Sequence, residues 1–115
     1  MGRRQGVYRV GLRREGLHEP SVSRIETDAP VDNEGRGERF SPTDLVCAAL
    51  ASCMLTTMGI VARRRGWPLE GARAEVQKHM VTEPARRIGR IAVRFAMPQG
   101  LPEDARAVLV RTAHT

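Results

Sequence analysis

The stretch SPTDLVCAALASCMLTTM, residues 41–58, decides how the rest of the chain must be arranged. It holds both cysteines and one charged residue, in a chain with 28% charged residues. Ser41 and Asp44 have the spacing of a capping box, and Pro42 suits the first helical position, so we expect a helix to begin here. Apolar side chains then occupy every face, which is typical of a helix buried on all sides.

The same helix should be unusually long for a small protein. The cations Arg63–Arg65 suit a helix C-terminus, and Gly66 is expected to stop the helix. About 24 residues would run about 36 Å. The rest of a 115-residue chain cannot easily cover so long an apolar helix, so we expect a second copy of the chain to share the core.

The remaining sequence predicts short strands and a second helix. Alternating apolar and polar residues predict strands at 7–12, 21–27, 73–81 and 88–97, and a helix that begins at Pro102. Turn-forming residues predict turn or loop structure at 13–20, a loop at 28–39 and a hairpin loop at 82–87. Strands, a long helix, further strands and a last helix together predict an α+β fold with antiparallel strands.

Length and composition limit the function classes. A chain of 115 residues suits one domain. The net charge is +6, but the arginines are interleaved with acids and aromatic residues make up only 3%, so we expect no nucleic-acid partner. No signal-peptide layout is present, and no uninterrupted apolar run reaches the roughly 18 residues that span a bilayer. We therefore expect no membrane association and a cytoplasmic protein with reduced thiols.

The two cysteines differ in their surroundings. Cys47 and Cys53 are separated by about 9 Å of helical rise, too far for a disulfide, and they lack metal-ligand spacing, so no metal or cofactor is expected. A buried cysteine is ordinarily inert. Cys53, however, lies among small residues, and the hydroxyls of Thr56 and Thr57 could bond a thiolate. The scattered histidines, which we expect at the surface, are His18, His79 and His114.

Two runs resemble one family: TDAPVDNEGRGERFSPTDLVCAALASCMLTTMG at 27–59 and ARRIGRIAVRFAMP at 85–98. They are similar to the OsmC/Ohr family, the osmotically inducible protein C and organic hydroperoxide resistance proteins. The resemblance implies a single OsmC-like domain over residues 1–115, in which two chains interlock around long buried central helices as a homodimer. It also implies a thiol-dependent peroxidase, active in oxidative stress defence, that reduces organic or hydrogen peroxides.

In the mechanism so implied, Cys53 is the catalytic residue and Cys47 matches no catalytic position. The Cys53 thiolate attacks the peroxide and becomes a sulfenic acid, a second cysteine condenses with it, and a dithiol reductant restores both.

The chain departs from the family in three places. The second helix ends at Thr115 without the family's Cys-Pro motif, so we expect that motif and the last strand to be lacking. Thr43 stands where the hydroperoxide branch has Glu. The arginine that steadies the thiolate is not distinguished among Arg9, Arg13 and Arg14. The alternative is therefore a non-enzymatic OsmC-like stress protein that binds a small apolar ligand at the dimer interface.

Overall fold

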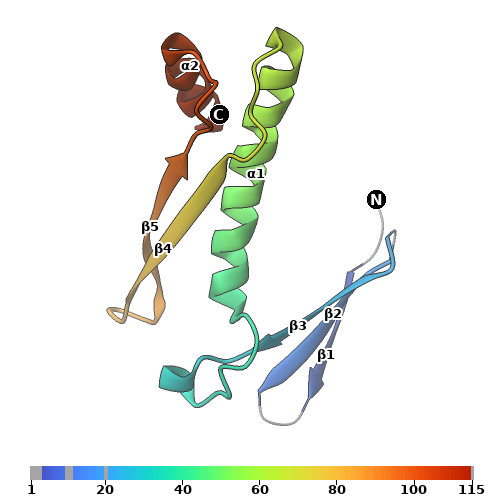
Figure 1. The fold of residues 1–115 in the computed structure, drawn as a ribbon. Helices are drawn as coiled ribbons and strands as arrows, with labels where there is room; N and C mark the ends of the chain where they lie inside the picture. Colours follow the sequence, from blue (N-terminus) through green and yellow to red (C-terminus); the bar gives the residue numbers. More distant parts are fainter. Residues whose placement is uncertain (1–3, 10–11, 20, 115) are drawn as a thin grey trace. The chain divides into compact units, whose positions relative to one another are not determined.

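The computed structural model describes residues 4–9, 12–19 and 21–114 (Figure 1). Its elements are β1 (Arg4–Arg9), β2 (Arg13–His18), β3 (Ser23–Asp28), the 3-10 helix η1 (Val31–Asn33), α1 (Pro42–Arg65), β4 (Arg73–Val81), β5 (Arg87–Ala96) and α2 (Glu103–Ala113). The chain comprises two compact units, residues 1–46 and 47–115, and α1 begins in the first and continues in the second. The predicted α+β fold is confirmed.

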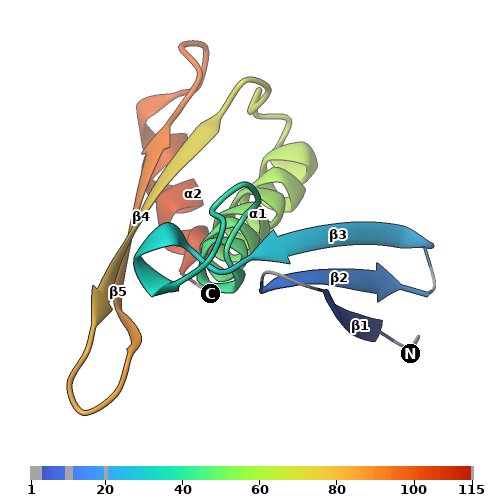
Figure 2. The same ribbon diagram turned by 90° about the horizontal axis from the view of Figure 1, so that it is seen from below.

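The first unit holds a three-stranded antiparallel sheet with β2 in the centre (Figure 2). β2 pairs with β1 from Arg13 to His18 and with β3 over the same residues. The prediction of turn or loop structure at 13–20 is therefore wrong. The strand predicted at 7–12 begins earlier, at Arg4, and its residues 10 and 11 lie outside the described part of the chain.

The turns that bound β2 explain this error. Leu12 and Val22 have φ of 62° and 59°, in the left-handed region that glycine ordinarily occupies. Because neither position is a glycine, the sequence does not mark these two turns. Gly16, in contrast, lies inside the strand and resembles a turn signal. Pairing on both sides of β2 outweighs its weak strand propensity.

A buried ion pair joins β2 to the end of β3. Arg13 Nε and Nη2 donate to the two carboxylate oxygens of Asp28 at 2.8 and 2.9 Å, and the Asp28 side chain has no solvent exposure. The backbone N–H of Glu38 donates to Asp28 Oδ2 at 3.2 Å, and the N–H of Asp28 donates to the carbonyl of Phe40 at 3.1 Å. One carboxylate thus closes the loop that leads from β3 into α1.

The predicted caps of α1 are confirmed. The N–H of Asp44 donates to Ser41 Oγ at 3.1 Å, and the N–H of Ser41 donates to Asp44 Oδ2 at 3.1 Å. Gly66 follows the last helical residue with φ of 71°. The helix has 24 residues, as its caps predict.

The second unit packs a hairpin and α2 against the later part of α1 (Figure 1). β4 and β5 pair from Arg73–Ala96 to Val81–Arg87, and the half-buried and exposed residues alternate as predicted. The core contains Met58, Ala62, Leu101, Ala105, Leu109 and Ala113. The buried residues of α2, Ala105, Leu109 and Ala113, thus form one stripe that faces the core.

One chain buries only part of α1. Its buried residues are Cys47, Ala51, Met58 and Ala62, whereas Val46, Leu50 and Ile60 are 51%, 36% and 48% exposed. By length and composition α1 could also cross a membrane, and 22% of its most apolar window is buried. The core helix of a water-soluble protein meets the same criterion.

We predict that Leu109→Ala lowers the free energy of unfolding by about 2–5 kcal/mol, because Leu109 has no solvent exposure and its removal leaves a cavity. Chemical denaturation at a fixed protein concentration would measure the change. Val110→Ala, at a neighbouring 39% exposed position, should cost less than about 1 kcal/mol. Equal losses in the two variants would contradict this description of the core.

We also predict that Asp28→Asn lowers Tm at pH 7. The Arg13 hydrogen bonds hold the pKa of Asp28 below its usual range, so this carboxylate stabilises the fold above about pH 4, and its contribution is lost as pH falls further. The Tm difference between the wild type and the variant should therefore shrink between pH 7 and pH 3. Glu26→Gln, which changes an exposed carboxylate, should lower Tm little at either pH. A difference that is independent of pH would refute the role of the charge.

Candidate functional site

Cys53 lies on an exposed stripe of α1. Leu50, Cys53, Thr57 and Ile60 follow one another at intervals of three, four and three residues, which places them on one helix face. Leu50, Cys53 and Ile60 are exposed in the single chain. Such spacing is typical of a seam along which a second helix packs. The predicted nucleophile is thus accessible in the single chain, with Leu50 before it and Thr57 after it along this stripe.

Cys47 has the opposite environment. It is 6% exposed, and both cysteines are free thiols. The prediction that Cys47 is structural agrees with this burial. In the single chain, Cys53 is therefore accessible to a reagent and Cys47 is not.

The hydroxyl of Thr57, which we expected to hydrogen-bond the Cys53 sulfur, bonds to a backbone carbonyl. Thr57 Oγ1 donates to the backbone carbonyl of Cys53 at 2.9 Å, so this hydroxyl is bonded to the helix backbone and not to the sulfur. Among the residues that the structure describes, no side chain hydrogen-bonds to the sulfur of Cys53.

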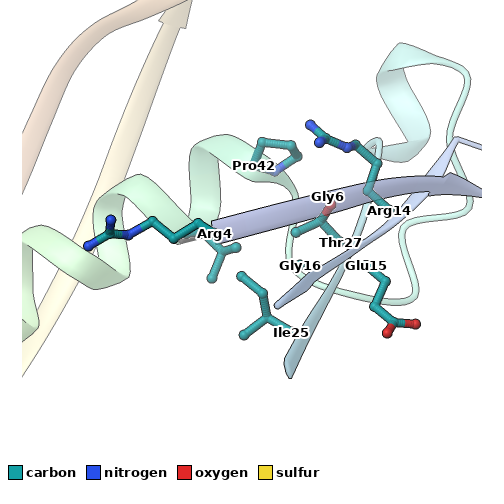
Figure 3. A pocket seen from close by; sticks show the side chains of 9 residues that line it. Arg4, Gly6, Arg14, Glu15, Gly16, Ile25, Thr27 and Pro42 are labelled. Carbon is teal, nitrogen blue, oxygen red and sulfur yellow. The ribbon is translucent and has the colours of Figure 1, made fainter. Parts of the chain in front are cut away.

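The three candidate arginines differ in what they contact. Arg13 is held by Asp28, which raises the pKa of Arg13 through their hydrogen bond, and its Nη2 lies 3.8 Å from Glu38 Oε1. The guanidinium of Arg14 instead lines a cavity on the sheet of the first unit (Figure 3). The side chain of Arg9 lies outside the described part of the chain. Arg13 therefore serves the fold.

The helix start offers no carboxylate in place of the family's Glu. Thr43 Oγ1 lies 3.1 Å from Ser41 Oγ, and the carboxylate of Asp44 accepts from the Ser41 N–H in the cap. The neighbouring acid is thus already engaged at the helix terminus.

The sequence analysis missed one feature, the cavity of about 380 Å³ on the first sheet, lined by Arg4, Gly6, Arg14, Glu15, Gly16, Ile25, Thr27, Pro42 and Leu45. Recognising β2 as a strand would have placed Arg14 and Gly16 on one face. Elsewhere, His79 lies on the outward face of β4, with Nε2 3.0 Å from Arg90 Nη2, and His18 Nδ1 lies 2.6 Å from Ser21 Oγ. Within residues 4–9, 12–19 and 21–114, no three His, Cys, Asp or Glu residues form a group that could hold a metal.

Comparisons with known proteins agree with the geometry. The chain resembles, with 42% identity and a TM-score of 0.93, a Psychrobacter arcticus protein described as an osmotic stress induced and detoxification response protein; the match covers 100% of this chain and 83% of that one. An organic hydroperoxide resistance protein OsmC from Legionella pneumophila shares 19% identity at a TM-score of 0.75, over 97% and 82% of the two chains. OhrB of Bacillus subtilis shares 18% identity at a TM-score of 0.69, over 97% and 83%.

The last two likenesses concern the fold alone, and no curated protein matches the chain. The profile of the OsmC-like protein family matches residues 35–115, which include Cys53 and both helices. Together with the 42% identity over the whole chain, this match shows that the chain belongs to the OsmC/Ohr family of OsmC-like proteins.

Proposed function

We propose that this protein is a thiol peroxidase that reduces organic or hydrogen peroxides at Cys53. The thiolate attacks one peroxide oxygen, the S–O bond forms and the O–O bond breaks. The leaving alkoxide or hydroxide takes up a proton and departs as alcohol or water. The sulfur loses two electrons to the peroxide and becomes a sulfenic acid. The family's hydroperoxide resistance members support this reaction class.

The exposure of Cys53 carries the proposal. Of the two cysteines, Cys53 is exposed and Cys47 is buried, and Cys53 lies in an apolar stripe that would receive the organic part of a hydroperoxide. A thiol must be accessible to react, whereas a buried thiol is inert. The difference in exposure between the two thiols thus supports Cys53 as the reactive one.

The oxidised Cys53 needs a sulfur from outside these 115 residues. Cys47 lies about 9 Å away along the helix axis, beyond disulfide reach. We propose that an external thiol condenses with the sulfenic acid, releasing water as the S–S bond forms. A dithiol reductant then restores the Cys53 thiol by exchange.

We predict that one equivalent of cumene hydroperoxide converts Cys53 to a sulfenic acid that dimedone traps. Peptide mass spectrometry should locate the adduct at Cys53. Cys47→Ser should keep the full yield, whereas Cys53→Ser should lose it. A folded wild-type protein that gains no adduct would refute the peroxidase and favour a non-enzymatic role.

We further propose that a second copy of the chain covers the exposed stripe of α1, giving the interlocked homodimer within a cytoplasmic protein. A membrane could cover the same apolar residues, but the stripe includes the thiol and has the four–three spacing of helix pairing. The dimer would place a partner's groups beside Cys53, where one chain offers the sulfur none.

We predict that the protein sediments in water at about twice its 12.7 kDa mass. Leu50→Glu should weaken the dimer by at least about 100-fold, because it buries an unpaired carboxylate in the seam. Val31→Glu, at a 74% exposed position of η1, is the matched control and should leave the mass unchanged. A wild-type monomer, or a protein that needs detergent, would contradict the proposal.

The non-enzymatic alternative rests on the same stripe. Its apolar side chains could hold a small apolar ligand between two copies of the chain. Cys53 would then line the ligand site and would not act as a nucleophile. Native mass spectrometry would show the retained ligand together with unreactive thiols.

A further inference from the structure

One face of the three-stranded sheet is hollowed by two neighbouring glycines. Gly6 of β1 lies opposite Gly16 of β2, which lies opposite Ile25 of β3. Because neither glycine has a side chain, the backbone forms a flat floor beneath the cavity of about 380 Å³ (Figure 3). This volume falls at the lower end of roughly 300–1,000 Å³, the usual range of small-molecule sites. We call the cavity the sheet hollow.

The charges of the sheet are divided between its two faces. Successive residues of a strand point to opposite faces, so the acids Glu15, Glu26 and Asp28 belong to the face opposite the hollow. Glu15 also borders the hollow, but its carboxylate is paired: Glu15 Oε1 lies 2.6 Å from Arg24 Nη1, and Figure 3 shows the Glu15 side chain pointing away from Arg14. The strand residues on the hollow's own face include Arg4, Arg14 and His18 but no acid. The hollow therefore favours an anion.

Arg14 is the cation best placed to hold that anion. Within the described part of the chain, its guanidinium has no hydrogen-bond or ion-pair partner. It lies over Gly6, where a Cβ would collide with Arg14 Nη2. The glycine thus provides the space that lets the guanidinium lie across the floor.

The other walls of the sheet hollow are apolar. Ile25 is 52% exposed, and Pro42 and Leu45 at the start of α1 complete the lining. We propose that the sheet hollow binds a small organic anion, a carboxylate or phosphate monoester with a flat apolar body. The body lies over Gly16, and the oxyanion accepts hydrogen bonds from the Arg14 guanidinium above Gly6, whose planar fork matches both groups. None of the residues that line this cavity is a cysteine.

The test is an NMR titration of the ¹⁵N-labelled full chain carrying Cys53→Ser, which removes any peroxidase chemistry. The probes are 2-naphthoate, phenyl phosphate and the neutral 2-naphthalenemethanol. We expect saturable shifts at the amides of Gly6, Gly16 and Ile25 with at least one anion, and at least about 10-fold weaker binding of the alcohol. The anion that binds more tightly identifies the headgroup.

Two variants and a matched control locate the site. Arg14→Gln should weaken anion binding about 10-fold, and Gly6→Val should abolish it by filling the floor. Arg24→Gln removes an equal charge from the opposite face and should leave the affinity unchanged. Retained peak dispersion shows that each variant folds. Equal losses with Arg14→Gln and Arg24→Gln, or no saturation below about 10 mM, would overturn the proposal.

Discussion

Helix α1 is apolar on every face, yet one chain covers only the side that carries Cys47, Ala51, Met58 and Ala62. Leaving the remaining aliphatic side chains in water costs roughly 25 cal/mol for each Å² of apolar surface. The remaining structure cannot remove this cost, because α2 and the β4–β5 hairpin pack against residues from Met54 onward. The helix therefore requires a cover, and Cys53 lies where that cover must sit. In the proposed dimer, the reactivity of Cys53 and the completion of the core therefore depend on the same contact.

Local signals made much of the second unit and the start of α1 predictable. The capping box, the terminal arginines and Gly66 each act within a few residues, so the helix bounds follow from the sequence. The alternation in β4 and β5 and the stripe of α2 likewise reflect which side each residue turns to the core. Such patterns can be recognised in the sequence because apolar residues recur at one constant spacing along each helix or strand.

The first unit was less predictable because its structure depends on distant pairings. β2 is polar and contains Gly16, and its turns use Leu12 and Val22 at positive φ, where no glycine marks them. The Arg13–Asp28 pair joins residues fifteen positions apart, so it follows from strand register and not from local composition. The candidate site shows the same division. Composition alone did not distinguish the two thiols as candidates for the reactive residue. The family resemblance selected Cys53, and the structure shows that Cys53 is exposed in the single chain whereas Cys47 is buried.

The pairing register of β2 determines which partners its two adjacent arginines meet. Arg13 and Arg14 are chemically identical, but the pleat turns them to opposite faces of the sheet. Arg13 meets a buried carboxylate, so its charge is neutralised and contributes to the closure of the loop before α1. Arg14 turns to the face whose strand residues include no acid, and its charge is available to a ligand. A shift of one residue in pairing would exchange these roles. The register that fixes the entry to α1 therefore also creates the anion-attracting hollow.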